Sequence, residues 1–160
     1  EGTHLSEGRG TTRSLEIVGA HGLDMRRILT EMHALAPQWL QGCKLRHCFF
    51  QPMFHKFQME LCEGMQIHVD DRYYDHEKFR PFRVIALWLK TIRKIYPKYA
   101  IWRDFPYEYE KDRLAIDFIS GGPFLREWVD DSEAKIGDLE VVLEQDENSW
   151  KGNRQKFLLY

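Results

Sequence analysis

The sequence has no apolar run approaching the roughly 20 residues of a membrane-spanning helix, and no secretory signal peptide is recognisable. It also lacks an excess of charge of one sign, since 23 Lys and Arg side chains are balanced by 25 Asp and Glu side chains, for a formal net charge of −2. Without a global basic field, the chain has no general attraction for nucleic acid or for an anionic membrane. We therefore expect neither a nucleic-acid partner nor a membrane span.

Cysteine is scarce and follows no metal-binding pattern. The three cysteines, Cys43, Cys48 and Cys62, form no C-x-x-C pair, and their odd number excludes a fully paired disulfide framework. A zinc site with nearby His47 and His55 is the alternative to buried free thiols, which are the ordinary state of such residues. We predict free thiols, no metal and no cofactor.

Internal repeats and low-complexity tracts are absent as well. With 160 residues, of which 43% are hydrophobic and 30% charged, the composition is that of one compact globular domain. Aromatic residues reach 14%, and several lie beside charged ones, as in Arg72-Tyr73-Tyr74-Asp75. This arrangement suits stacking on a carbohydrate, and it also suits the margin of a core.

Apolar periodicity predicts short strands that alternate with helices. Strands are expected at residues 16–18, 44–51 and 65–69, and the apolar terminus 157–160 should dock as a strand or plug. In Met65-Gln66-Ile67-His68-Val69 the apolar residues should face the core, which puts Gln66 and His68 together on the opposite face. There the amide and the imidazole suit hydrogen bonds to sugar hydroxyls, and the alternative is the solvated side of an edge strand.

Five helices are expected between and after these strands. One should follow Asp24 as its N-cap, the strongest should begin at Pro81, and a short one should span residues 114–118. Two more should follow Gly121-Gly122-Pro123 and include Leu139. The fold class is therefore α/β or α+β, with a small sheet of three to four short strands packed with about four to five helices.

The first twelve residues combine three glycines, four hydroxyl side chains, two carboxylates and one guanidinium. Glycines let a backbone approach a ligand and turn its N–H groups toward an anion. Arg9 adds a planar fork suited to a carboxylate or phosphate, whereas the alternative is an internal pair with Glu1 or Glu7 that holds the loop. We predict a ligand-lining loop. The chain has no initiator Met before it, so we also expect a segment of a longer protein.

Four carboxylates lie in the most ordered polar contexts: Glu1, Glu7, Glu63 and Asp117. Glycoside hydrolysis needs two carboxyl groups roughly 5–10 Å apart, and the sequence places no pair at such a distance. For each carboxylate an ion pair or a loop hydrogen bond is the simpler expectation. A triad of Ser6, His68 and Asp117 is set aside because no G-x-S-x-G elbow supports it.

Several blocks, in one order from residue 1 to residue 160, resemble a bacterial family of exo-β-N-acetylmuramidases of peptidoglycan recycling that was long a domain of unknown function. The blocks are Glu1-Gly2-Thr3, Ser6-Glu7-Gly8-Arg9-Gly10-Thr11-Thr12, Phe50-Gln51-Pro52, 62–69, Phe79-Arg80-Pro81, Tyr107-Glu108, Ala115-Ile116-Asp117 and Leu158-Leu159-Tyr160. The sequence departs from the pattern at His4, where many members have Asn, and in a longer, more charged stretch at 71–78.

The resemblance implies the C-terminal part of a two-domain glycosidase that releases N-acetylmuramic acid from the non-reducing end of peptidoglycan fragments. Residues 1–12 would join the domains and line the cleft, residues 13–160 would form a C-terminal α/β domain, and a Rossmann-like domain carrying the catalytic glutamates would precede them. Substrate contacts are then expected from Glu7, Arg9, Thr11, Gln66 and His68, with Glu7 the one catalytic candidate in this chain.

The same resemblance implies a peptidoglycan-derived sugar and the N-terminal domain as partners. It also implies a location in the bacterial periplasm, at the cell surface or outside the cell. The alternative function is a carbohydrate- or cell-wall-binding module without catalytic groups.

Overall fold

A three-stranded antiparallel sheet forms one side of the molecule. The computed structural model describes residues 1–108 and 112–159, apart from the side chain of Asp71. In the sheet, β3 (Cys62–His68) lies between β1 (Ile17–Ala20) and β2 (Lys44–Phe50). The three predicted strands are confirmed with shifted ends, and so is the α/β class with a small sheet.

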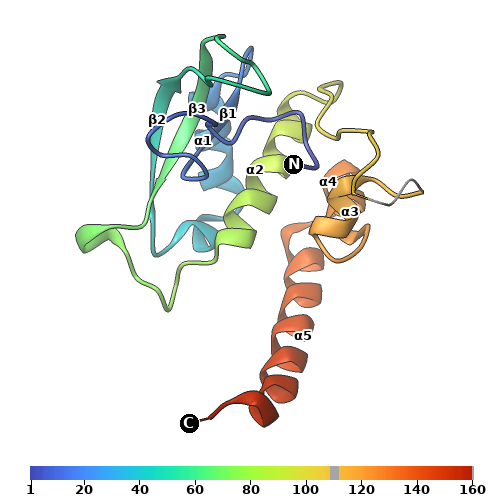
Figure 1. The fold of residues 1–160 in the computed structure, drawn as a ribbon. Helices are drawn as coiled ribbons and strands as arrows, with labels where there is room; N and C mark the ends of the chain where they lie inside the picture. Colours follow the sequence, from blue (N-terminus) through green and yellow to red (C-terminus); the bar gives the residue numbers. More distant parts are fainter. Residues whose placement is uncertain (109–111, 160) are drawn as a thin grey trace.

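The helices of the described residues cover one face of this sheet and continue away from it (Figure 1). α1 contacts β2 and β3, α2 packs on α1, α4 packs on α2, and α3 packs on α4. α5 then leads out of the body (Figure 1). The helices span Met25–Leu35 (α1), Pro81–Ile95 (α2), Ala115–Ile119 (α3), Phe124–Asp130 (α4) and Ile136–Arg154 (α5), with 3-10 turns at Pro37–Leu40, Asp71–Tyr73 and Gln155–Phe157.

The start of α1 shows why the helices begin where the sequence predicts. Asp24 is the N-cap, and its carboxylate accepts a hydrogen bond from the Arg27 backbone N–H at 3.0 Å. Glu63 of β3 accepts a second one from the Met25 N–H at 3.1 Å. One helix N-terminus is thus fixed both locally and by the sheet, and Met25, Ile28 and Met32 of its apolar stripe are completely buried.

Two glycines set how closely the strands approach at the centre of the sheet. Gly19 of β1 pairs with Gly64 of β3, and the Phe50 ring lies against both. A Cβ atom on Gly64 would meet the Val18 carbonyl oxygen at 2.4 Å and Phe50 Cε1 at 2.6 Å. Only a residue without a side chain fits there, because the space is filled by backbone and a buried ring.

The apolar C-terminus does not dock, and that prediction is wrong for the residues that the structure describes. Phe157, Leu158 and Leu159 are 69%, 42% and 95% exposed, and Tyr160 lies outside the described residues. Apolar composition predicted burial there, but this body offers no surface beside the end of α5 (Figure 1).

Cys62 is a buried free thiol, as predicted, whereas Cys43 and Cys48 are half-buried free thiols. Burial raises the pKa of Cys62 to about 11, so it is protonated at neutral pH. Across residues 1–108 and 112–159, no three His, Cys, Asp or Glu side chains gather as metal ligands, and no helix is long and apolar enough to cross a membrane.

Candidate functional site

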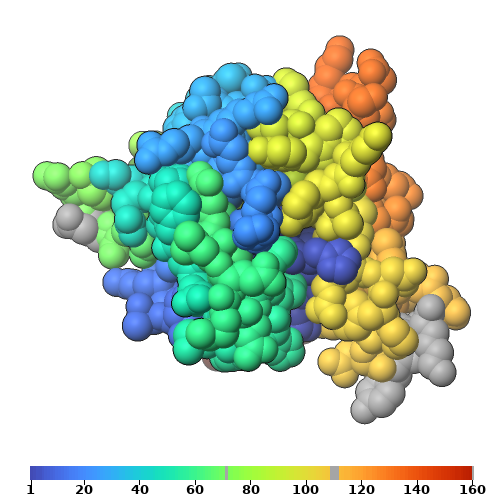
Figure 2. All heavy atoms as spheres, turned by 90° about the horizontal axis from the view of Figure 1, so that it is seen from above, coloured from blue at the N-terminus to red at the C-terminus, as the bar shows by residue number. Residues whose placement is uncertain are grey.

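The glycine-rich segment, residues 1–12, is anchored to the body on two sides. Ser6 pairs with Gly19 of β1, with N–H···O distances of 2.8 and 3.0 Å in the two directions. On the other side, the backbone N–H of His4 donates to the Ile101 carbonyl at 2.8 Å, and the backbone N–H of Arg103 donates to the Gly2 carbonyl at 3.1 Å. Figure 2 shows the first residues (dark blue) wedged between the green segment that includes residues 50–65 and the yellow segment near residue 100. The segment is therefore part of the folded body.

The turn at Gly8–Thr11 depends on two glycines with positive φ. Gly8 and Gly10 have φ angles of +70° and +80°, a region that side chains disfavour. Thr11 closes the turn, because its N–H and its hydroxyl both donate to the Gly8 carbonyl, at 3.0 and 2.7 Å. Met53 donates its N–H to the Arg9 carbonyl at 2.9 Å, which ties the turn to the loop after β2. Thr11 thus orders the turn, as its hydroxyl is occupied by the backbone.

Glu7 lies at the centre of the charged groups around this turn. Its carboxylate accepts a short hydrogen bond from Arg9 Nε and lies 2.5 Å from Lys56 Nζ, while Arg9 Nη2 lies 3.2 Å from Glu1. Burial raises the pKa of Glu7, but the hydrogen bonds from Arg9 and Lys56 outweigh it and lower the pKa from 4.5 to about 2. Glu7 is therefore ionised at neutral pH and has no proton to donate as a general acid.

A cavity of about 450 Å³ lies beneath the anchored segment. The segment forms one wall, including Gly2, whose backbone packs against Ile116 at the start of α3. The facing wall is the apolar side of α2 and the tips of α3 and α4: Phe82, Ile85, Trp88, Leu89, Ile119 and Leu125. Trp88 is 3% exposed, and its Nε1–H has no hydrogen-bond partner among the described residues.

A second hollow of about 190 Å³ shares Glu1 and Lys56 with the first one. Its other lining residues are Arg9, His55, Arg103 and Phe105, so two arginines and a lysine converge on it. Arg9 and Lys56 are paired with Glu7, whereas the Arg103 guanidinium has no acidic partner within residues 1–108 and 112–159 and lies 4.1 Å from the Phe105 ring centroid. An arginine over an aromatic ring, with no carboxylate of its own, suits an anionic group attached to an apolar or sugar body.

The five residues expected to contact the substrate fall into two groups. Glu7, Arg9 and Thr11 lie together at the turn, whereas Gln66 and His68 form a separate polar group with Arg46 of β2 and line neither of the two cavities. Arg46 donates to the Gln66 oxygen at 2.5 Å and to His68 Nε2 at 3.3 Å. Both side chains share one face of β3 as predicted, but Gln66 is 7% exposed because Arg46 covers it. Their contact with a sugar stays a prediction.

The remaining candidate carboxylates are held by structural partners. Asp117 forms a bidentate pair with Arg126 at 2.9 and 2.8 Å, and Glu63 binds His47 Nε2 at 2.7 Å as well as the start of α1. Glu1, Glu7, Glu63 and Asp117 thus each form the expected ion pair or hydrogen bond, and the absence of a catalytic role for them stays a prediction. None of Ser6, His68 and Asp117 hydrogen-bonds another of the three, in agreement with setting that triad aside.

Three residues of this site were missed by the sequence analysis: Lys56, Arg103 and Phe105. They lie in the loop between β2 and β3 and in the loop after α2, where no periodicity or motif marks them. The only sequence signal was the concentration of aromatic and charged residues near residue 105, which composition alone could not assign to a site.

Comparison with known proteins identifies the family. The family model described as "Exo-beta-N-acetylmuramidase NamZ, C-terminal" matches residues 1–160. The chain belongs to the NamZ C-terminal family. A curated member, peptidoglycan beta-N-acetylmuramidase NamZ of Bacillus subtilis (strain 168), is 31% identical over 166 residues, which cover 100% of the chain. The NamZ C-terminal region described here spans 35% of that relative, or about a third of its length.

A solved structure supports the NamZ C-terminal fold. The crystal structure of a DUF1343 family protein from Bacteroides fragilis NCTC 9343 superposes with a TM-score of 0.72 at 20% sequence identity. The match covers 98% of the chain and 38% of that protein. The two proteins therefore share this fold, and both matched proteins are much longer than the matched region.

Proposed function

We propose that this chain is the substrate-binding C-terminal part of a peptidoglycan-recycling glycosidase that releases terminal N-acetylmuramic acid. The observation that carries the proposal is the pair of hollows that share Glu1 and Lys56, one walled by α2 and the other lined by Arg9, Lys56 and Arg103. N-acetylmuramic acid has two matching features, a sugar ring with apolar faces and a lactyl carboxylate. The NamZ relationship supports this substrate class.

We assign recognition of the lactyl carboxylate to Arg103. Arg9, the residue that the sequence favoured, already shares its guanidinium between Glu7 and Glu1, and a second carboxylate there would compete with both. Arg103 lines the same hollow without an acidic partner among the described residues, and Phe105 supports its planar group. The carboxylate would therefore bind Arg103, and Glu7 would hold Arg9 and Lys56 in place.

The catalytic carboxyl groups are assigned to a part of the protein that precedes this chain. Hydrolysis of a glycosidic bond needs one protonated and one ionised carboxyl group at defined separation. Glu7 is ionised and bound by two cations, and Glu63 and Asp117 serve α1 and Arg126. The chain thus offers binding groups and a preorganised loop, while proton transfer and attack on the anomeric carbon fall to the preceding domain.

Hydrolysis of a chromogenic N-acetylmuramide by the full-length protein and by residues 1–160 alone tests this division. The full-length protein should release the chromophore, and the 160-residue chain should not do so above the uncatalysed rate. Turnover by the chain alone would place the catalytic carboxylates within it and contradict the proposal.

One observation favours the binding module as second candidate, namely that the four candidate carboxylates, Glu1, Glu7, Glu63 and Asp117, all have structural partners. The upstream sequence separates the two: a Rossmann-like domain before Glu1 supports the glycosidase, and its absence supports the module.

A further inference from the structure

The inner face of α5 contacts the body from the start of the helix as far as Glu147. Leu139 and Leu143 are 2% and 8% exposed, and Glu140 and Glu147 flank them on the same side. Both glutamates bind the buried Arg83 of α2, Glu140 with two bonds at 2.9 and 2.6 Å. This stripe of alternating apolar and acidic contacts is what attaches the helix to the body.

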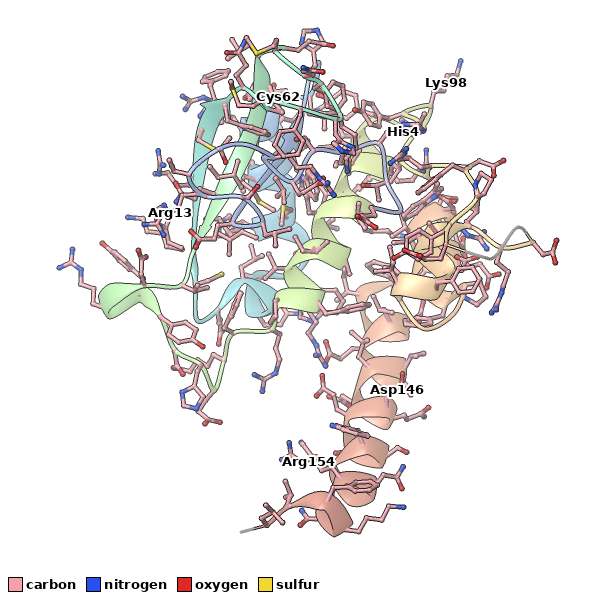
Figure 3. The ribbon with its side chains drawn as sticks, in the orientation of Figure 1. His4, Arg13, Cys62, Lys98, Asp146 and Arg154 are labelled. Carbon is pink, nitrogen blue, oxygen red and sulfur yellow. The ribbon has the colours of Figure 1, made fainter. Side chains whose placement is uncertain are left out.

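The same stripe continues past the edge of the body. At 100° per residue, Trp150 lies on the face of Leu139 and Leu143, yet it is 60% exposed. Every residue from 148 to 159 is exposed, among them Phe157, Leu158 and Leu159. Asp146 and Arg154, labelled in Figure 3, lie on the part of α5 that stands clear of the rest of the molecule.

A helix end of this kind is not stable by itself. Helices shorter than about 12–15 residues are marginal in water unless an apolar face is buried. Burying a large apolar side chain contributes on the order of 1.5–3 kcal/mol, and here a tryptophan and three more apolar residues remain open. The part of α5 after Glu147 therefore needs a partner that continues the surface on which the preceding part of the helix rests.

We propose that this partner is the preceding part of the same polypeptide, which packs on the α5 end surface formed by Trp150, Phe157, Leu158 and Leu159. The chain spans 35% of its curated relative and 38% of the solved protein that shares its fold, so most of a protein of this kind lies outside residues 1–160. The inference rests on the two-part organisation proposed above, and it is independent of the sugar that the site binds.

Area and entropy favour this partner over a second copy of the chain. A stable interface between separate proteins buries about 800 Å² on each partner, and four apolar residues at one helix end fall well short of it. A covalently linked partner avoids most of the entropy lost in association, so a small apolar contact is sufficient. Docked in this way, α5 is a strut that fixes the orientation of the preceding domain relative to the two cavities.

Photo-crosslinking in the full-length protein tests the proposal. In Trp150→p-benzoylphenylalanine an aromatic group replaces an aromatic one, and Phe157→p-benzoylphenylalanine probes the same surface from a second position. Val141→p-benzoylphenylalanine is the matched control, because Val141 is 54% exposed and lies two residues, or 200°, from the Leu143 stripe. After irradiation, mass spectrometry should find crosslinks within one molecule from positions 150 and 157 to residues before Glu1. Position 141 should form no crosslink to those residues.

Covalent dimers from positions 150 and 157 would show that a second copy covers the surface, and either this result or the absence of crosslinks would overturn the proposal. Muramide hydrolysis by the same unmodified protein reports separately on the function. Crosslinks in a protein that does not hydrolyse the muramide would support the packing of α5 and contradict the glycosidase function. Hydrolysis without crosslinks would support the function and contradict the packing.

Discussion

At the scale of single residues, Glu7 is half-buried between Arg9 and Lys56 and carries the largest downward pKa shift in the site. Its pKa of about 2 in the folded protein lies below its ordinary value of 4.5. A carboxylate with a lowered folded pKa contributes stability above the unfolded pKa and loses it as the pH falls through the folded pKa. The contribution of Glu7 is thus complete above about pH 4.5 and disappears toward pH 2.

Glu7→Gln should therefore lower the melting temperature at pH 7 by several degrees, and this difference from the unmodified chain should shrink between pH 4.5 and pH 2. Thermal unfolding followed by circular dichroism across this range is the measurement. If the difference between the two proteins does not change with pH, Glu7 is not the ionised centre of the loop.

The sequence predicted the nature of these residues better than their partners. Carboxylates, a guanidinium and glycines in one short segment indicated a structured polar loop, and Arg9 does pair with Glu7 and Glu1. Lys56 is far from Glu7 in the chain, and Arg103 is farther still. Local composition carries no information on such long-range pairs. The sequence therefore could not show that Arg9 is paired with Glu7 and Glu1, or that Arg103 has no acidic partner among the described residues.

At the scale of elements, periodicity predicted the helices and strands because their signals are local. Two helix starts follow from single residues, Asp24 and Pro81. The buried face of β3 follows from the alternation in Met65-Gln66-Ile67-His68-Val69. The pairing of Gly19 with Gly64 is different, since it follows from the order of strands in the sheet. A glycine in a strand pattern indicates a close approach but does not name the partner.

Gly64→Ala tests this close approach. The added Cβ would lie 2.4 Å from a carbonyl oxygen of β1, so the strands must separate, and the expected loss is about 1–3 kcal/mol of unfolding free energy, as for other overpacked sites. Gly152→Ala is the control, because nothing lies within 4 Å of its Cβ position on α5 and alanine favours a helix by roughly 0.5–1 kcal/mol. Urea denaturation should show a lower midpoint for Gly64→Ala only, and equal midpoints would contradict the register.

At the scale of the whole molecule, two features point beyond the 160 residues. One is an anchored loop over two neighbouring cavities, and the other is a helix whose apolar stripe continues past the part that contacts the body. The sequence predicted a buried apolar terminus, but the described part of the terminus is exposed. Burial requires a surface to pack against, and residues 1–108 and 112–159 provide none there. Our two proposals give both features one interpretation, in which the chain binds the sugar and α5 positions the catalytic domain against it.

The central claim is that the cavities hold N-acetylmuramic acid with its lactyl carboxylate on Arg103. The most direct measurement is kcat/KM of the full-length protein for a chromogenic N-acetylmuramide and for the same compound with its lactyl group amidated. The unmodified protein should prefer the carboxylate at least tenfold, about 1.4 kcal/mol. Arg103→Gln should abolish this preference and leave turnover of the amide nearly unchanged.

Two variants serve as controls in that measurement. Arg113→Gln removes another arginine that stacks on a phenylalanine, 4.2 Å from the Phe118 ring centroid and outside both cavities, and it should keep the preference. Arg9→Lys should lower turnover of both compounds in proportion, because it disturbs the loop through Glu7. Equal losses on the two compounds in Arg103→Gln, or a selective loss in Arg9→Lys, would contradict the account.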